Sequence, residues 1–242
     1  MDELTRRFCQ AADDYGLSLT DKQVEQFARY GALLLSWNEK MNLTALTAPQ
    51  EVAVKHFIDA ASVWRAAWFT GDIQRVVDVG TGAGFPGLPL KILHPELDVT
   101  LLDALNKRVQ FLTAVIDALH LTGVTAVHAR AEEGARQKRY RERFDAAVSR
   151  AVAPMAVLVE YALPFVKVGG FLAAQKGAKF REEAEAAAKA IALLGGAPPV
   201  MESVKLPGLD DVRAVLYVKK ARPTPALYPR KAGTPEKKPL GG

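Results

Sequence analysis

The sequence predicts an α/β fold built on a mostly parallel sheet, and three observations support this prediction. Short apolar segments rich in β-branched residues alternate with helical segments over residues 75–194, a rhythm typical of βαβ units. A glycine-rich turn follows the first of these segments. The last two apolar segments, 200–206 and 213–219, are joined by a turn-forming stretch, which predicts a terminal antiparallel hairpin.

Residues 1–70 are expected to form a helical extension that packs against this sheet. Thr20 and Gln23 have the spacing of a capping box, and the apolar residues of 24–35 form one stripe on the helix that follows. A second helix is predicted around 49–68, after a polar break. We therefore divide the chain into this extension, a main domain over 71–220 and a tail over 221–242.

The main domain alternates strands and helices in sequence order. Its strands are short, apolar and β-branched, as expected of a parallel sheet that is covered on both faces. The predicted strands before the hairpin are 76–79, 98–103, 124–128, 144–149 and 169–176. The predicted helices are 86–93, 106–119, 154–166 and 179–194. Pro86 suits the first turn of a helix, and Gly195 with Gly196 suits the end of one.

The turn after the first strand is the motif around which the chain is organised. It contains four glycines, Gly80, Gly82, Gly84 and Gly87. Glycine adopts positive φ angles and lets a ligand approach the backbone closely, so this turn predicts a nucleotide site. Gly82 to Gly87 also fits the dinucleotide pattern G-x-G-x-x-G, so the glycines alone do not identify the nucleotide.

Asp78, two residues before the first glycine, favours one nucleotide over the other. A dehydrogenase would hold an anionic pyrophosphate at this turn, where a carboxylate would repel it. S-adenosylmethionine brings an ammonium and a sulfonium instead, and leaves as S-adenosylhomocysteine. The sequence therefore predicts a class I S-adenosylmethionine-dependent methyltransferase. This fold is Rossmann-like, with a seven-stranded, mostly parallel sheet whose last strand is antiparallel.

Three further positions at predicted strand ends are expected to contact the cofactor, because open α/β sheets bind ligands at this edge. Asp103 ends the second strand and is expected to accept both ribose hydroxyls, the alternative being a helix N-cap. Ala131 and Glu132 follow the third strand, and their backbone is expected to lie beside the adenine. Arg150 follows the fourth strand and is expected to bind the cofactor carboxylate or an RNA phosphate, unless it is a surface arginine.

The net charge of +5 is concentrated at the end of the chain, because residues 219–242 hold seven basic residues and one acid. A basic, Pro- and Gly-punctuated tail attracts a phosphate backbone, although such tails are often only solvated. Charge alone makes six residues candidates for RNA binding: Lys91, Arg108, Lys176, Arg222, Arg230 and Lys231. Removing residues 222–242 is then expected to weaken RNA binding and to leave cofactor binding intact.

Several kinds of chemistry and location are disfavoured. The single cysteine, Cys9, excludes an internal disulfide and lies too far upstream to attack pyrimidine C5. The stretch 149–154 lacks the Asn/Asp-Pro-Pro-aromatic turn of exocyclic amine methylases. The four histidines, His56 included, show no metal-ligand spacing, so no metal is expected and no catalytic residue is assigned. We expect no membrane segment, a cytoplasmic location and a monomer.

Methylation of guanine N7 needs neither a cysteine nucleophile nor an Asn/Asp-Pro-Pro-aromatic turn. The lone pair of N7 lies free in the ring plane, and no proton has to leave before attack. The absence of an obvious base is therefore compatible with methylation at N7. Two alternatives stay open at this point: a class I methyltransferase with another RNA, a protein or a small molecule as substrate, and a non-catalytic RNA-binding assembly factor.

Nine short motifs resemble those of the bacterial small-subunit ribosomal RNA guanine-N7 methyltransferases, also called glucose-inhibited division protein B. They are Trp37-Asn-x-x-x-Asn42-Leu-Thr44, His56-Phe-x-Asp59, Asp78-Val-Gly-x-Gly-x-Gly-Phe-Pro-Gly87, Leu101-Leu-Asp103, Lys107-Arg108, Ala131-Glu132, Ser149-Arg-Ala151, Lys176-Gly177 and Tyr228-Pro-Arg230, with Gly84-Phe-Pro-Gly87 the most specific.

The resemblance implies methyl transfer from S-adenosylmethionine to N7 of one guanine in 16S ribosomal RNA, free or within a small-subunit particle. It also implies that the cofactor is contacted by Gly80, Phe85, Asp103, Ala104, Leu105, Ala131, Glu132 and Arg150. Ala60 and Ala104 stand where serine is expected in many members.

Overall fold

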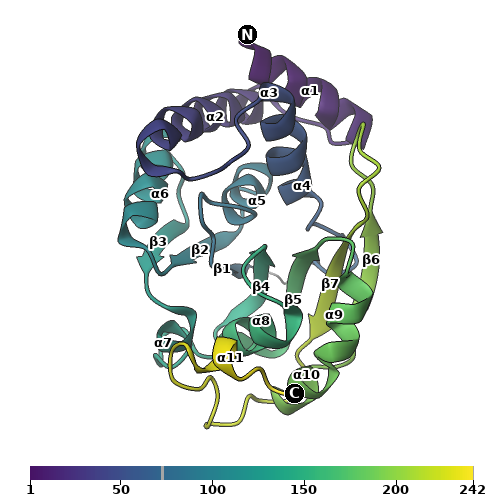
Figure 1. Cartoon of the computed structure of the whole chain (residues 1–242). Coiled ribbons are helices and arrows are strands. Elements are labelled where there is room, and N and C mark those ends of the chain that lie inside the picture. Colours follow the sequence, from purple (N-terminus) through teal and green to yellow (C-terminus); the bar gives the residue numbers. More distant parts are fainter. Residues whose placement is uncertain (72–73, 242) are drawn as a thin grey trace.

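The computed structural model describes residues 1–71 and 74–241, and it contains one seven-stranded sheet (Figure 1). The strands are β1 (Arg75–Val79), β2 (Asp98–Asp103), β3 (Val124–His128), β4 (Phe144–Arg150), β5 (Val166–Lys176), β6 (Val200–Val204) and β7 (Arg213–Lys219). Their order is β3-β2-β1-β4-β5-β7-β6, with β1 to β5 parallel and β7 antiparallel to both neighbours. The predicted fold class is confirmed, including the terminal hairpin.

Helices cover both faces of the sheet. They are α1 (Glu3–Tyr15), α2 (Asp21–Met41), α3 (Pro49–Glu51), α4 (Asp59–Ala61), α5 (Gly87–Leu93), α6 (Asn106–Ala118), α7 (Ala131–Gly134), α8 (Met155–Ala162), α9 (Phe180–Ala186), α10 (Ala188–Leu193) and α11 (Thr234–Lys237), with a π-helix at Val52–Ile58 and a 3-10 turn at Leu163–Phe165. Successive strand residues alternate between two cores: Val76 packs with α1, α2, α5 and α6, whereas Val77 packs with α8 to α10. None of the helices in the described ranges is long and apolar enough to cross a membrane.

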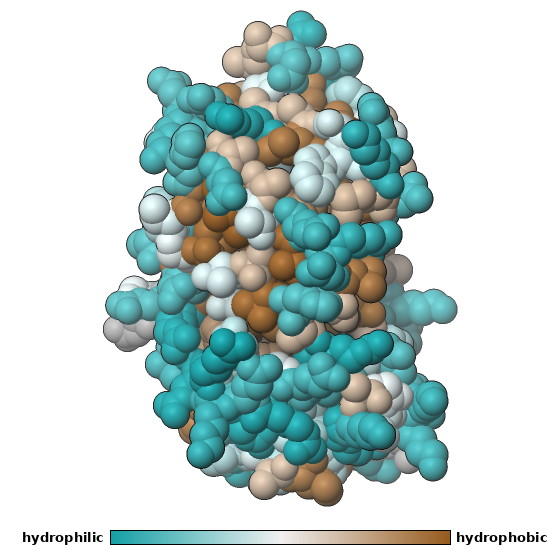
Figure 2. All heavy atoms as spheres, turned by 90° about the vertical axis from the view of Figure 1, so that its left-hand side faces the viewer, coloured by the Kyte–Doolittle hydropathy of each residue, from teal (hydrophilic) through white to brown (hydrophobic). Residues whose placement is uncertain are grey.

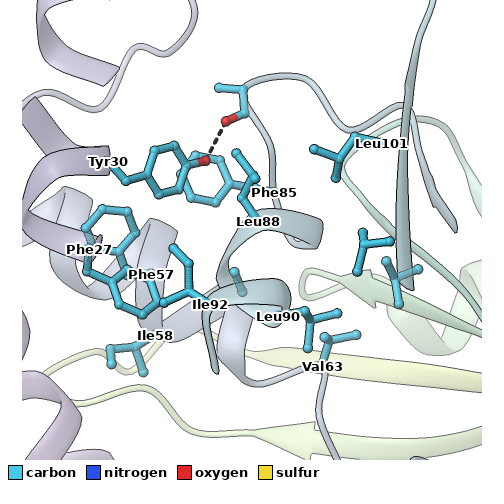
Figure 3. Close-up of a cluster of buried hydrophobic side chains, with 14 of the residues drawn as sticks. Phe27, Tyr30, Phe57, Ile58, Val63, Phe85, Leu88, Leu90, Ile92 and Leu101 are labelled. Atoms are coloured by element: carbon cyan, nitrogen blue, oxygen red, sulfur yellow. Dashed lines mark hydrogen bonds between the residues drawn. The ribbon is translucent and has the colours of Figure 1, made fainter. Parts of the chain in front are cut away.

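The N-terminal helices support the glycine-rich turn directly. The capping box of α2 is present, and Gln23 also donates its side-chain amide to the carbonyls that end α5. Tyr30, on the same helix, is fully buried and donates its hydroxyl to the Ala83 carbonyl within the turn. Figure 3 shows this bond and the Phe85 ring beside Tyr30, with Phe57 packed in the same cluster. The helical extension therefore shares a core with the sheet and fixes the shape of the turn.

Several predicted element boundaries are wrong. The helix expected over 49–68 stops at Ala61 and is a π-helix in its middle. The helix expected over 154–166 gives way to a 3-10 turn at Leu163, because Pro164 has no N–H to continue it. The strand expected from 169 begins at Val166, ahead of a register irregularity opposite β4. The helix expected over 179–194 is broken at Ala187.

The C-terminal segment is folded back onto the domain and is not a solvated extension. In Figure 1 it runs across the lower part of the molecule, from α10 past α7 to α11, which lies in front of α8. Thr224 and Leu240 are buried along this path. We call residues 222–241 the C-terminal strap. Figure 2 shows that the lower part of the face carrying α7 is covered mainly by hydrophilic side chains.

Candidate cofactor and substrate site

Two adjoining cavities lie at the carboxyl ends of the parallel strands. The first, here called the β2–β3 cavity, has a volume of about 270 Å³ and is lined by Val79, Gly80, Leu102, Asp103, Ala104, Leu105, Arg108, Ala129, Arg130, Ala131, Glu132, Ala151, Val152, Tyr161 and Glu236. The second, the β4–β5 cavity, measures about 540 Å³, and its polar lining includes Lys55, His56, Asp59, Ser62, Arg150, Gln175, Lys176, Glu183 and Arg213. Ala151 and Val152 line both, so they form the shared wall.

The β2–β3 cavity brings together six of the predicted cofactor residues, namely Gly80, Asp103, Ala104, Leu105, Ala131 and Glu132. Asp103 is 3% exposed, and its carboxylate accepts the amide N–H groups of Leu105 and Gly82, each at 2.9 Å. Carboxylate oxygens have about four acceptor positions between them, so Asp103 retains acceptor capacity toward a ligand. The turn is tied to β2 because the Gly80 and Thr81 amides donate to the Leu102 carbonyl.

Asp78 does not face either cavity, which differs from the direct contact that the sequence predicts. Its side chain is fully buried, and Oδ2 accepts the Thr81 hydroxyl at 2.6 Å and the Gly87 amide at 2.7 Å. Burial is the main cause that raises the pKa of Asp78 to about 7. Asp78 therefore closes the turn onto the start of α5, and its carboxylate contacts the turn itself.

Gly84 and Phe85 belong to the turn, but they pack against Tyr30 of α2 and line neither cavity. A Cβ at Gly84 would lie 2.4 Å from Leu88 and 2.8 Å from the Tyr30 hydroxyl, and its φ is +98°. Phe85 is stacked on the His56 ring, with 4.6 Å between ring centroids. These two residues therefore serve packing, and Phe85 supports the β4–β5 cavity from below.

Gly84→Ala is expected to lower the free energy of unfolding by about 1–2 kcal/mol more than Gly82→Ala, because only the former overpacks the core. Both positions have positive φ, but a Cβ at Gly82 meets no atom within 4 Å. Urea unfolding of the two variants measures the difference. Equal losses would show that backbone strain, and not contact with Tyr30 and Leu88, makes glycine necessary at position 84.

Arg150 is the centre of the polar wall of the β4–β5 cavity. Its guanidinium donates to the Lys55 carbonyl and to Asp59, both at 3.0 Å, and lies 4.7 Å from the centre of the Phe85 ring. The other oxygen of Asp59 accepts from Arg213 at 3.3 Å. Asp59 is therefore shared by two guanidinium groups, which together present positive charge to the cavity.

His56 is held neutral in this wall. Burial and the nearby Arg150 charge lower the pKa of His56 to about 3. Arg150 has only donors, so Nδ1 of His56, at 3.1 Å from it, must be the acceptor. The ring proton is then on Nε2, which donates to the Thr44 hydroxyl at 2.8 Å. Both ring nitrogens are engaged, so His56 positions Arg150 and is not available as a free base.

Acidification is expected to destabilise the native protein relative to a His56→Asn variant. The pKa of His56 is lowered from 6.5 to about 3 on folding, so the stability it contributes is present above 6.5 and is lost as the pH falls. The expected difference is about 1–2 kcal/mol between pH 7 and pH 5. Asp78, whose pKa is raised, acts in the opposite direction, so the comparison between the two proteins is the informative quantity.

The measurement is urea unfolding at a series of pH values, with His120→Asn as the control because His120 is exposed. Parallel pH profiles for the native protein and His56→Asn would contradict the assignment of a neutral His56.

The predicted RNA-binding residues are placed in three different settings. Lys91 is 3% exposed and donates to the Pro95 and Leu97 carbonyls, so it is not available to a phosphate, which corrects the prediction. Arg108 lines the β2–β3 cavity, 3.4 Å from Asp103. Lys176 lines the β4–β5 cavity, paired with Glu183 at 2.8 Å.

The remaining three lie on the C-terminal strap. Arg230 forms an ion pair at 2.6 Å with Glu160, whose side chain is fully buried, so Arg230 is primarily an anchor. Arg222 and Lys231 are exposed. Arg222 donates to the Ala192 carbonyl through one nitrogen.

Sequence reasoning missed several residues that line the two cavities. Asp59 and Arg213 are 154 residues apart and meet only because β7 is inserted next to β5. Tyr161 and Glu236 line the β2–β3 cavity from α8 and from the strap. No local sequence pattern predicts that Asp59 meets Arg213 or that Tyr161 meets Glu236. The motif that contains His56 and Asp59 was a usable signal, since the two residues lie on one side of a helical turn.

The lining of the β2–β3 cavity fits S-adenosylmethionine better than a dinucleotide. Asp103, Glu132 and Glu236 supply carboxylates, which accept hydrogen bonds from ribose hydroxyls and an adenine amine and attract a sulfonium. The same three carboxylates would repel a pyrophosphate, and one of the two arginines in the lining, Arg108, is already beside Asp103. We therefore expect these three residues to contribute the selection that the sequence attributes to Asp78.

The sheet and this cavity define a class I S-adenosylmethionine-dependent methyltransferase. Residues 23–210 match the family described as GidB, rRNA small subunit methyltransferase G, and the chain belongs to that family. It is 49% identical over 227 residues to "Ribosomal RNA small subunit methyltransferase G" of Alkaliphilus metalliredigens, covering 94% of this chain and 95% of the relative. The protein of the same name from Exiguobacterium sp. is 50% identical over 234 residues, covering 97% and 98%.

Solved structures agree on the fold. M. jannaschii TYW2 in complex with AdoMet superposes with a TM-score of 0.52 at 17% identity, covering 68% of this chain and 76% of that one. P. horikoshii TYW2 in complex with MeSAdo gives a TM-score of 0.52 at 18% identity, covering 69% and 62%. The family resemblance and the cofactor expected from the sequence are confirmed.

Proposed function

We propose that this chain transfers a methyl group from S-adenosylmethionine to N7 of a single guanine in 16S ribosomal RNA, free or within a small-subunit particle. It would act as a monomer in the cytoplasm, where that RNA lies. One observation carries the proposal: the β2–β3 cavity, which fits the cofactor, shares the wall Ala151–Val152 with a larger cavity bordered by cationic side chains. The names of the relatives support ribosomal RNA as the substrate.

The N7 position is supported by the state of the polar groups in the β4–β5 cavity. Asp59 is paired with two arginines, and both ring nitrogens of His56 are engaged. A target that must lose a proton before attack would need a free base here. Guanine N7 has an exposed lone pair and needs none, so holding the base in line with the methyl group and excluding water are sufficient.

The cofactor supplies an activated methyl group on sulfur. As the new bond from N7 to the methyl carbon forms, the bond from that carbon to sulfur breaks and its electron pair stays on sulfur. The guanine ring thereby gains a positive charge. Sulfur loses its positive charge in the same step, so the total charge in the site is unchanged. Asp59 and Glu183, the acids of the lining, stay paired with Arg150, Arg213 and Lys176.

The RNA backbone is expected to contact the cations at the rim of the β4–β5 cavity. Arg150, Lys176 and Arg213 are in its wall, and the planar guanidinium groups suit bidentate contact with phosphate. Arg222 and Lys231 of the C-terminal strap are also exposed and carry positive charge elsewhere on the surface, with Arg222 beside the end of α10, near the amino end of β5. We propose these five as the RNA-binding residues, with Arg108 assigned to the cofactor side.

The test uses small ribosomal subunits and free 16S RNA from a strain that lacks this enzyme, incubated with the purified protein and labelled S-adenosylmethionine. The expected result is one labelled nucleotide that is identified as N7-methylguanine by chemical cleavage at that base. Asp103→Ala, tested at a cofactor concentration that only the native protein binds, is the control that separates enzyme-dependent label from background. Label on another base or on protein would replace the proposed substrate, and bound RNA without label would indicate a non-catalytic factor.

A further inference from the structure

The C-terminal strap is held along its whole length by groups of the main domain. Thr224 is 5% exposed, and its amide donates to Glu142 at 2.7 Å. Further along, Arg141 donates to the Thr224 and Tyr228 carbonyls at 3.0 and 2.8 Å, and Arg136 donates to the Leu227 and Pro229 carbonyls. These arginines lie between α7 and the start of β4, so the first half of the strap is bonded near the amino ends of the strands, and only its second half approaches the site.

The second half of the strap is fixed next to the β2–β3 cavity. Arg230 reaches Glu160 of α8 through both its guanidinium and its backbone amide, the amide bond measuring 2.7 Å. The Gly233 amide then donates to Glu132 Oε1 at 2.9 Å. Glu132 is 5% exposed and lines the cavity. The strap is therefore connected directly to a residue of the cofactor site.

Glu236 completes this arrangement because it lines the cavity itself. Glu236 follows Gly233 by three residues in the chain. It lies beside the hydroxyl of Tyr161, which also lines the cavity. Tyr161 belongs to α8, the helix that holds Arg230 through Glu160. One end of the β2–β3 cavity is thus built by α7, α8 and the strap together.

The topology indicates which half of the cofactor occupies that end. The methyl group must face the β4–β5 cavity, so the sulfur and its amino acid belong near Ala151 and Val152, after β4. The sheet order β3-β2-β1-β4 then places the adenosine over the ends of β2 and β3. Glu132, which follows β3, lies at that end, and so does the strap residue that bonds to it.

We propose that the C-terminal strap forms the outer wall of the cofactor site, and that Glu236, supported by Tyr161, contacts the adenosine half of S-adenosylmethionine. A carboxylate accepts hydrogen bonds only, so its partner is a donor of the adenosine, either the adenine amine or a ribose hydroxyl. The strap then belongs to cofactor recognition, which the charge of the segment does not suggest.

The test is calorimetric titration of Glu236→Ala with S-adenosylhomocysteine and, separately, with 5′-methylthioadenosine, which has the adenosine but no amino acid group. Loss of the contact is expected to weaken binding of both ligands by about tenfold. Lys237→Ala is the matched control: Lys237 is exposed in the same short helix and lines neither cavity, so its affinities are expected to match those of the native protein. Circular dichroism and thermal unfolding confirm that each variant is folded.

An unchanged affinity of folded Glu236→Ala for both ligands would overturn the proposal, and a loss confined to S-adenosylhomocysteine would overturn the assignment to adenosine. Hydrogen exchange of the native protein gives an independent readout: S-adenosylhomocysteine is expected to slow exchange of amides in residues 230–236, and unaltered exchange there would count against a strap wall. Neither measurement involves RNA, so the outcome is separate from the identity of the methylated base.

Discussion

Replacing Asp103 by alanine is expected to weaken the binding of S-adenosylmethionine about 100-fold, which corresponds to about 3 kcal/mol. The side chain is 3% exposed at the end of β2, and it lines the cavity with acceptor positions that the Gly82 and Leu105 amides leave free. Alanine removes the acceptor oxygens that the two ribose hydroxyls are expected to use. Asp103→Asn retains one carbonyl oxygen and is expected to show an intermediate affinity.

Calorimetric titration of the cofactor measures the effect, and thermal unfolding without ligand corrects for the two amides that alanine also leaves unpaired. Asp117→Ala is the control, because Asp117 is an exposed carboxylate on α6. If Asp103→Ala is folded and binds the cofactor as tightly as the control does, then Asp103 serves only to hold the turn through Gly82 and Leu105.

The sequence was sufficient to predict the sheet because its strands are local patterns. Each parallel strand is a short β-branched run, and the cavity residues Gly80, Asp103 and Glu132 lie at or just after the ends of β1, β2 and β3. Helix ends were predicted less well. The 3-10 turn at Pro164 and the π-helix near His56 replace regular α-helical hydrogen bonds with other local ones. The spacing of apolar residues does not predict such changes.

Site residues that belong to one strand-end loop were predicted from the sequence. Site residues that come together from distant segments were missed. Asp78 has the expected sequence position, but its orientation follows from hydrogen bonds to Thr81 and Gly87 that no spacing rule gives. The contact between Glu132 and Gly233 spans 101 residues and depends on how the strap crosses α8. Removing the strap is therefore expected to affect cofactor binding, contrary to what its charge suggests.

Charge was the least reliable guide, because it does not distinguish a free cation from a paired one. Lys220 is fully buried, and burial lowers its pKa to about 8, although it lies in the most basic stretch of the chain. It is held by the Leu163 carbonyl, Thr224 and Glu142. Lys91 and Arg230 are likewise satisfied within the protein, so the charge available to RNA is smaller than composition implies.

Arg230→Ala is expected to lower the free energy of unfolding by about 3 kcal/mol, because it leaves the buried carboxylate of Glu160 without its cationic partner. Glu160 has no exposed side-chain surface, whereas 21% of the Arg230 side chain is exposed, which places the effect at the low end of the range for buried pairs. Urea unfolding measures the loss. Lys231→Ala removes an equal charge from the adjacent exposed residue and is expected to change stability by less than about 0.5 kcal/mol.

A double-mutant cycle with Glu160→Gln separates this pair from other effects of the substitutions. If Glu160 is the partner that matters, then Arg230→Ala is expected to cost much less in the Glu160→Gln background, because a neutral amide is less costly to bury than an unpaired carboxylate. Additive losses would show that Arg230 acts through another contact, such as its bond to the Lys238 carbonyl. Equal stability of Arg230→Ala and Lys231→Ala would instead return Arg230 to the set of free cations available to RNA.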